Sequence, residues 1–241
     1  MCPVSSLGQH DAYHGGECAL RDRLMIAMDV PDMDQAMAVR DKLGETVHWF
    51  KVGLQLFVSC GPPLIRRLLE SNKIFLDLKF LDIPNTVAEA VRSAANLGVH
   101  MLNVHACGGM DMLDAAVKAA DPYPQLRLIA VTVLTSEKMD AEAARRVALA
   151  RAVMARDAGM HGIVCSAHEV SVIKQACGED FLAVTPGIRW ADQNTNDQHR
   201  VATPGLAIRN GADYLVVGRP ILGAGDPLAM ARQAIDEMKQ A

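Results

Sequence analysis

The stretch IFLDLKFLDIPNT, residues 74–86, places three charged side chains at the end of an otherwise apolar run. Asp77 and Lys79 lie two residues apart, so on a β-strand both side chains project from the same face. Asp82 follows just beyond the predicted strand, where Pro84 stops regular strand pairing and suits the first turn of a helix. Because a buried charge is costly unless it has a partner, an acid, a base and a second acid here indicate a catalytic site.

The surrounding pattern repeats along the chain from residue 24 onward: a short apolar run, a loop and then an amphipathic segment. Strands that alternate with helices in this way pair in parallel through right-handed crossovers. An open doubly wound sheet is the alternative, but eight repeats, nearly continuous apolar strands and no GxGxxG after the first strand favour a closed, single-domain (β/α)8 TIM barrel. The predicted strands are residues 24–28, 48–52, 74–78, 101–105, 128–133, 162–165, 181–184 and 214–217, and the clearest predicted helices are residues 33–43, 64–70, 86–97, 110–119 and 141–158.

The length and composition of the chain agree with one large domain. Its 241 residues are 50% hydrophobic and only 4% aromatic, which indicates a single core of mostly aliphatic side chains. No long linker rich in Pro, Gly or Ser divides the sequence. Residues 1–19 are polar and show no periodicity, so we interpret them as a flexible N-terminal tail and residues 20–241 as the barrel catalytic domain.

Charge and cysteine spacing argue against several classes of protein. The formal net charge is −4 and the basic residues are scattered, which argues against a nucleic-acid partner. No apolar run is long enough to cross a membrane, and the N-terminus lacks the basic and apolar pattern of a secretory signal. The six cysteines form no CxxC pair, which favours reduced thiols in the cytoplasm over disulfides or a zinc site.

The carboxyl ends of the predicted strands carry charged residues, and a barrel places its active site at these ends. Asp29 follows the first strand and Lys51 lies near the end of the second, while Asp77 and Lys79 belong to the third. A single such charge is commonly a satisfied loop residue. Alternating charges from three successive strands can offset one another's desolvation, so we expect these four side chains to form one catalytic cluster.

A second set of residues is suited to binding phosphate. Gly218 and Arg219 follow the eighth predicted strand, and late barrel loops commonly bind phosphate through backbone N–H groups and cationic side chains. The longest stretch without periodicity, residues 186–200, follows the seventh strand and contains Gln198. At the C-terminal face of a barrel, this loop is expected to act as a lid that brings Gln198 to the phosphate.

Taken together, these motifs resemble the orotidine 5′-phosphate decarboxylase family. The resemblance extends from about residue 24 to the C-terminus, and its most specific part is the string DLKFLDIPNT. It implies a (β/α)8 barrel that forms a homodimer with its active sites at the subunit interface. The supporting segments, in the family's order, are MIAMDV, WFKVG, NVHACGG, VTVLTS, VTPGIR, DQHR and YLVVGRP.

The resemblance implies a role for each member of the charged cluster. Asp29 and Lys51 resemble the acid that contacts the ribose and its paired lysine. Asp77 corresponds to the carboxylate that faces the leaving CO2 group, and Lys79 to the proton donor. Asp82, the third acid of the motif, is implied to complete the catalytic group around that lysine.

The resemblance also implies contacts across the interface and around the nucleotide. Asp82 and Thr86 are expected to reach into the partner subunit's active site. Leu81 stands where the family commonly has His, and Trp190 where Pro often follows the arginine of GIR, but neither position is among the implied functional groups. The remaining implied substrate contacts are Thr135, which would read the pyrimidine amide, and Arg189, Gln198, Gly218 and Arg219, which would bind the nucleotide and its phosphate.

The implied reaction is decarboxylation of orotidine 5′-monophosphate to uridine 5′-monophosphate and CO2, with no metal and no cofactor. The nearest alternative is a sugar-phosphate decarboxylase or aldolase-like lyase, in which the acids of DxKxxD would hold Mg²⁺. The IPNT and LTS segments favour the nucleotide enzyme. A non-catalytic phosphate-binding barrel or structural dimer is a further alternative, and it explains the grouping of Asp77, Lys79 and Asp82 poorly.

Overall fold

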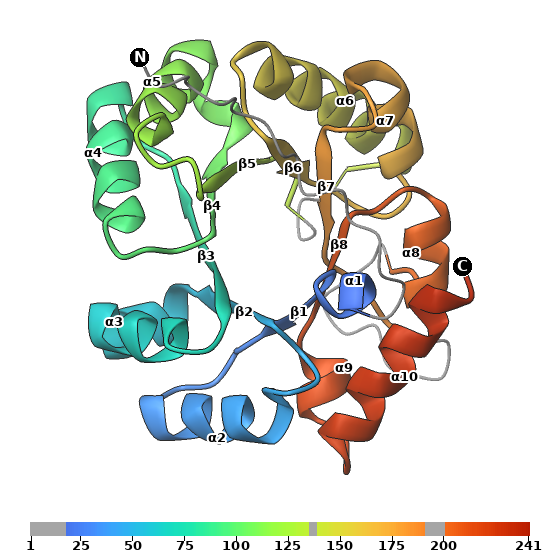
Figure 1. The fold of residues 1–241 in the computed structure, drawn as a ribbon. Coiled ribbons are helices and arrows are strands. Elements are labelled where there is room, and N and C mark those ends of the chain that lie inside the picture. Colours follow the sequence, from blue (N-terminus) through green and yellow to red (C-terminus); the bar gives the residue numbers. More distant parts are fainter. Residues whose placement is uncertain (1–17, 135–138, 191–200) are drawn as a thin grey trace, which may run out of the picture.

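Eight parallel strands close into a barrel in the computed structural model of the chain, which describes residues 18–134, 139–190 and 201–241 (Figure 1). Each strand pairs with the next one along the chain, and the first pairs with the eighth to close the barrel. The predicted (β/α)8 TIM barrel is therefore confirmed. The strands are β1 (Leu24–Ala27), β2 (Trp49–Gly53), β3 (Lys73–Phe80), β4 (Met101–His105), β5 (Arg127–Val131), β6 (Gly162–Val164), β7 (Leu182–Thr185) and β8 (Tyr214–Val217).

Helices surround the barrel on the outside, and at least one follows every strand along the chain (Figure 1). A short α1 precedes β1, and the short elements η1 and α9 lie directly after β4 and β8. The helices are α1 (Cys18–Arg21), α2 (Met33–Leu43), α3 (Leu54–Leu69), α4 (Pro84–Ala95), η1 (Ala106–Gly108), α5 (Met110–Ala120), α6 (Ala141–Asp157), α7 (Val170–Cys177), α8 (Pro204–Arg209), α9 (Arg219–Leu222) and α10 (Pro227–Lys239).

Capping residues determine where several of these helices begin. The Asp32 side chain accepts a hydrogen bond from the Gln35 N–H at the start of α2, and Asp140 accepts one from the Ala143 N–H at the start of α6. Proline is the first residue of α4, α8 and α10, where its missing N–H costs no helical hydrogen bond. These capping aspartates and first-turn prolines can be read from the sequence. Because they define where a helix begins, they also define where the loop before that helix ends.

Two layers of apolar side chains hold the barrel. Successive residues of a strand point to opposite faces, so one set packs outward against the helices and the other fills the barrel interior. The outward layer is the large core, with residues such as Ile26, Phe50 and Leu102. The inner cluster closes the interior beneath the carboxyl ends of the strands. Its fully or nearly buried members are Met25, Trp49, Phe75, Met101, Ile129 and Val184.

The predicted helix at residues 64–70 was too short at its N-terminal side. In the structure α3 begins at Leu54, and a kink at Gly61, with φ 60°, divides it in two. Gly61 is followed by Pro62 and Pro63, a sequence that is typical of a helix end, so the segment before it was not predicted as helical. Every other predicted helix or strand bound lies within two residues of the observed one.

The predicted boundary of the N-terminal tail at residue 19 overlaps α1, which begins at Cys18. Residues 1–17 lie outside the described part of the chain, so a flexible tail stays a prediction. No helix in residues 18–134, 139–190 or 201–241 is both long and apolar enough to span a membrane. Four cysteines within these ranges, Cys60, Cys107, Cys165 and Cys177, are not part of a disulfide.

Two histidines support the opposite end of the barrel, where the strands begin. His100, just before β4, accepts the Ile74 N–H of β3 on its Nδ1 atom at 3.3 Å. His161, just before β6, accepts the Leu128 N–H of β5 in the same way at 3.1 Å. A ring nitrogen accepts a hydrogen bond only while it carries no proton, so both contacts require the neutral imidazole.

The surroundings of both rings oppose protonation. Burial lowers the pKa of His100 below its ordinary value of 6.5, and the positive charge of Lys73 lowers it further. Burial likewise lowers the pKa of His161, with a further contribution from Arg127. The unfolded chain therefore binds protons at these two sites at a higher pH than the folded chain does.

Acidification from about pH 7.5 to about pH 5 is expected to destabilise the fold, because the unfolded chain takes up protons that the two neutral rings exclude. The contribution is fully present above about pH 6.5 and is lost as the pH falls below it. Urea unfolding across this range measures the slope. In a His100→Asn, His161→Asn variant, each amide oxygen can accept the same N–H without titrating, so a flatter slope is expected. An equal slope in this variant and the wild-type protein would contradict a contribution of His100 and His161 to the pH dependence of stability.

Candidate active site

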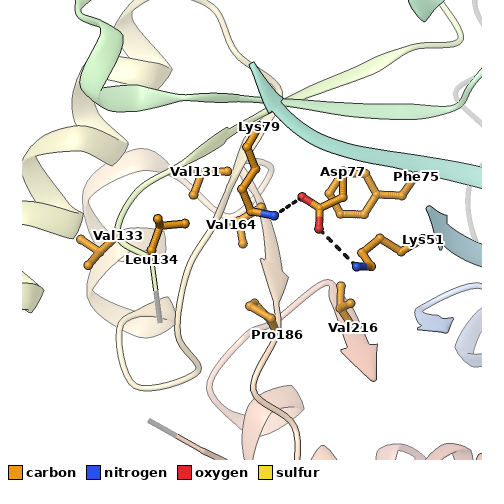
Figure 2. A pocket seen from close by; sticks show the side chains of 10 residues that line it. All are labelled: Lys51, Phe75, Asp77, Lys79, Val131, Val133, Leu134, Val164, Pro186 and Val216. Carbon is orange, nitrogen blue, oxygen red and sulfur yellow. Dashed lines mark hydrogen bonds and ion pairs between the residues drawn. The ribbon is translucent and has the colours of Figure 1, made fainter. Parts of the chain in front are cut away.

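Four charged side chains of alternating sign meet at the carboxyl ends of β1, β2 and β3. The Lys51 Nζ atom lies 3.1 Å from Asp29 Oδ1 and 3.5 Å from Asp77 Oδ2. The Lys79 Nζ atom lies 2.5 Å from Asp77 Oδ1, and Figure 2 shows both lysines pointing at this carboxylate. The structure therefore brings together the four residues that the sequence placed at three successive strand ends, in the order acid, base, acid, base.

Asp77 is the most enclosed acid of this cluster, with only 12% of its side chain exposed. Burial alone would raise the pKa of its carboxyl group. The positive charges of Lys51 and Lys79, and hydrogen bonds from Lys79 and Asn103, outweigh burial and lower that pKa below its ordinary value of 3.8. Asp77 is therefore a carboxylate at neutral pH, held between two ammonium groups.

The charged cluster faces a pocket of about 180 Å³ whose other walls are apolar (Figure 2). Lys51, Asp77 and Lys79 supply its polar groups. Low-polarity walls strengthen every electrostatic interaction inside such a pocket. The apolar lining consists of Phe75, Val131, Val133, Leu134, Val164, Pro186 and Val216.

Asn103 is a polar member of this site that the sequence reasoning missed. It lies in β4 and is fully buried. Its Nδ2 atom donates to Asp77 Oδ1 at 2.7 Å, and its Oδ1 atom accepts the Lys79 N–H at 2.8 Å. The available signal was an amide within the otherwise apolar run MLNV, since a buried polar side chain needs hydrogen-bond partners.

The backbone of Lys79 has φ 52°, in the left-handed region. Among the described residues it is the one non-glycine residue with positive φ. This conformation costs a lysine about 1 kcal/mol or more, and such strain is commonly found at functional sites. It accompanies a shift in the pairing of β3 with β4 between Leu76 and Phe80.

The predicted phosphate-binding residues lie around the ends of β7 and β8. Gly218 precedes α9, and a Cβ atom there would lie 3.2 Å from Asp29 Oδ2, so this glycine permits the close approach of β8 to the charged cluster. Arg219, the first residue of α9, is exposed. Arg189 is buried, its guanidinium donates to the Ile188 carbonyl, and its backbone N–H donates to the carbonyl of Ala202.

Asp82 and Thr86 do not join the cluster within the same chain. Both are exposed, and the Asp82 carboxylate accepts a hydrogen bond from the neighbouring Ile83 N–H at 2.6 Å. Within one chain the Lys79 ammonium group pairs with Asp77, and the expected contact of Asp82 with the partner's site stays a prediction. The loop that carries Asp82 instead points its acid toward solvent.

Thr135 and Gln198 lie outside the described residues, so their predicted contacts stay predictions. Leu134, which precedes Thr135, lines the pocket. Pro186, the first residue of the predicted loop that contains Gln198, lines it as well. Trp190, one of the two departures from the family pattern, is buried and donates from Nε1 to Glu237 of α10 at 2.5 Å.

Comparisons with known proteins place the chain in one family. The family described as orotidine 5′-phosphate decarboxylase / HUMPS matches residues 22–234. The chain belongs to this family. The orotidine 5′-phosphate decarboxylase of Moorella thermoacetica is 46% identical over 236 residues, which cover 91% of this chain and 93% of the relative. That of Legionella pneumophila (strain Paris) is 49% identical over 215 residues, which cover 85% and 94% respectively.

Solved structures of the family agree with the fold. A crystal structure of orotidine 5′-phosphate decarboxylase from Lactobacillus acidophilus matches with a TM-score of 0.79 and 35% sequence identity, and the match covers 90% of this chain and 99% of that chain. The resemblance inferred from the motifs is therefore confirmed along the whole barrel.

Replacing Lys51 by methionine, which keeps most of the length of the side chain but removes its charge, is expected to raise the pKa of Asp77. The carboxyl carbon of Asp77, followed by ¹³C NMR during an acid titration, measures the change. Lys73→Met is the matched control, because Lys73 lies at the other end of the barrel near Asp22. Equal Asp77 pKa values in the two variants would show that Lys51 does not stabilise this carboxylate.

Proposed function

We propose that this protein catalyses the decarboxylation of orotidine 5′-monophosphate to uridine 5′-monophosphate and CO2, without a metal or cofactor, in pyrimidine synthesis. The observation that carries the proposal is the ammonium group of Lys79, which lies 2.5 Å from the largely enclosed carboxylate of Asp77 and faces a pocket whose other walls are apolar. Relatives 42–49% identical to this chain bear the name of that enzyme. We expect the enzyme in the cytoplasm, where cysteines outside disulfides, such as Cys60, Cys107, Cys165 and Cys177, would stay reduced.

Decarboxylation of this substrate requires a positive charge near C6 of the pyrimidine ring. Loss of CO2 from C6 of the pyrimidine leaves a carbanion that has no neighbouring electron sink. In the proposed mechanism, Lys79 stabilises this developing charge and then delivers its proton to C6. Because Asp77 is ionised and hydrogen-bonded to Lys79, the ammonium group is already positioned before the substrate arrives.

Asp77 has a second proposed role, toward the group that leaves. The substrate carboxylate would lie near the Asp77 carboxylate and against the apolar lining. A charged carboxylate is unfavourable in such surroundings, whereas neutral CO2 is not, so leaving the ring relieves the unfavourable contact. Val131 of β5, Val164 of β6 and Val216 of β8 supply part of this lining.

The phosphate and ribose would be held at the opposite side of the site. Arg219 and the backbone at Gly218 are proposed to bind the phosphate, assisted by Arg189 and Gln198, while Asp29 and Lys51 hold the ribose. Thr135 is proposed to read the pyrimidine amide. Contacts remote from the reacting carbon supply binding energy that fixes the ring against Lys79.

A homodimer is part of the proposal, and exposed apolar side chains support it. Ile83, next to Asp82, is 66% exposed, and Val58 of α3 is 81% exposed. Leu54, Leu81 and Met110 are also exposed, and all five follow the carboxyl ends of the adjacent strands β2, β3 and β4. Large apolar side chains grouped beside a loop mark an interaction surface. A second copy there would bring Asp82 and Thr86 to the partner's pocket.

The loss of pyrimidine absorbance from orotidine 5′-monophosphate, without added metal or cofactor, tests the activity. Lys79→Ala is expected to lower kcat by about 10⁴-fold or more, because it removes both the proton and the positive charge. Lys42→Ala, on the exposed face of α2, is the control and should retain full activity. EDTA should leave wild-type turnover unchanged. A wild-type protein that leaves the nucleotide intact would refute the proposed function.

Mixing inactive Lys79→Ala subunits with Asp82→Ala subunits is expected to restore activity, because each hybrid dimer contains one site with both groups intact. Random mixing should give about a quarter of wild-type activity. Native mass spectrometry verifies that hybrids form. Replacing the Asp82→Ala subunit by a Lys79→Ala, Asp82→Ala double variant is the negative control. Hybrids without recovered activity would place both groups in a site within one subunit.

A further inference from the structure

The position of Lys79 depends on a break in the sheet. β3 and β4 pair as Phe75 with Met101 and Leu76 with Leu102, and pairing then resumes at Phe80 with Val104. Four residues of β3 therefore span a distance that two residues of β4 span. Lys79 lies within this bulge, so its backbone N–H has no carbonyl of β4 opposite it in the regular ladder.

The side chain of Asn103 takes the place of the missing ladder contact. Its Oδ1 atom accepts the Lys79 N–H at 2.8 Å, and its Nδ2 atom donates to Asp77 Oδ1 at 2.7 Å. The same Oδ1 atom of Asp77 accepts the Lys79 ammonium. One fully buried amide thus holds the backbone of the base and the carboxylate of the acid at once.

We propose that Asn103 is a positioning residue, which keeps Lys79 in its left-handed conformation and fixes Asp77 between the two lysines. The expected effect on kcat rests on the proposed function. The structural role of Asn103 rests on its hydrogen bonds to Asp77 and Lys79. Asn103 acts through Asp77 and Lys79, and it is not itself proposed to touch the substrate.

The chemistry of the two contacts restricts the residue type. One end must accept an N–H and the other must donate to a carboxylate, and a primary amide of this length does both. Leucine has a similar size but can do neither. An ionised aspartate can accept the Lys79 N–H but repels Asp77, whereas a protonated one can also donate. With aspartate at position 103, the contact to Asp77 would therefore form only when the new carboxyl group is protonated, which makes it dependent on pH.

Steady-state kinetics on orotidine 5′-monophosphate test the proposal in three variants. Asn103→Leu is expected to lower kcat on the order of 100-fold, as for the loss of hydrogen bonds to charged groups, while KM changes less than about threefold. Asn72→Leu is the matched control: Asn72 is also buried, but it precedes β3 at the other end of the barrel. The Asn72→Leu variant should unfold more easily than the wild-type protein and keep the wild-type kcat.

Asn103→Asp provides a measurement that a purely structural role would not change. Its kcat is expected to be low at neutral pH and to rise relative to wild type as the pH falls, because the protonated carboxyl group can donate to Asp77 again. The groups that face it are Asp77, Lys79 and, through Asp77, Lys51. If Asn103→Leu fails to fold, the pH profile of Asn103→Asp still tests whether Asn103 positions Asp77 and Lys79.

The outcomes are separable from those of the proposed function. Equal kcat in Asn103→Leu and Asn72→Leu, or an Asn103→Asp profile parallel to wild type, would overturn the positioning role while leaving the activity intact. If the wild-type protein has no activity, the Asp77 titration by ¹³C NMR still tests the role. Asn103→Leu should then raise the pKa of Asp77, and an unchanged pKa would overturn the proposal.

Discussion

The ion pairing of the largely enclosed Asp77 carboxylate with two ammonium groups is the interaction on which the rest of the site depends. Burial opposes its negative charge, and Lys51, Lys79 and Asn103 together overcome that opposition. Removing one of these partners weakens the compensation of a charge that is held in largely apolar surroundings, which is expected to be destabilising. The cluster therefore behaves as one unit.

The closed barrel explains how such a unit can be rigid. Its members come from adjacent strands whose spacing is set by the backbone ladder, with Asp29 after β1, Lys51 in β2, Asp77 in β3 and Asn103 in β4. Beneath them the interior cluster around Phe75 and Met101 fills the barrel. The charges are thus held at the strand ends by a closed ladder and a packed interior.

Much of this arrangement could be predicted from the sequence because the relevant signals are local. Apolar runs gave the strands, and the two-residue spacing of Asp77 and Lys79 put both side chains on the pocket side. Other features depend on tertiary context. The bulge in β3 and the amide of Asn103 that spans it arise from the pairing of two strands, and the first half of α3 was obscured by Gly61 and the prolines after it. In the proposed homodimer, the distance of Asp82 from a pocket would depend on how the two chains are arranged, and the sequence of one chain does not define that arrangement.

The left-handed backbone of Lys79 sets local backbone strain against side-chain chemistry at a single position. Glycine would adopt φ 52° without strain, but it would also remove the ammonium group that pairs with Asp77. A substitution that relaxes the backbone here therefore takes a partner away from the enclosed carboxylate, so this position offers no simple route to a more stable protein.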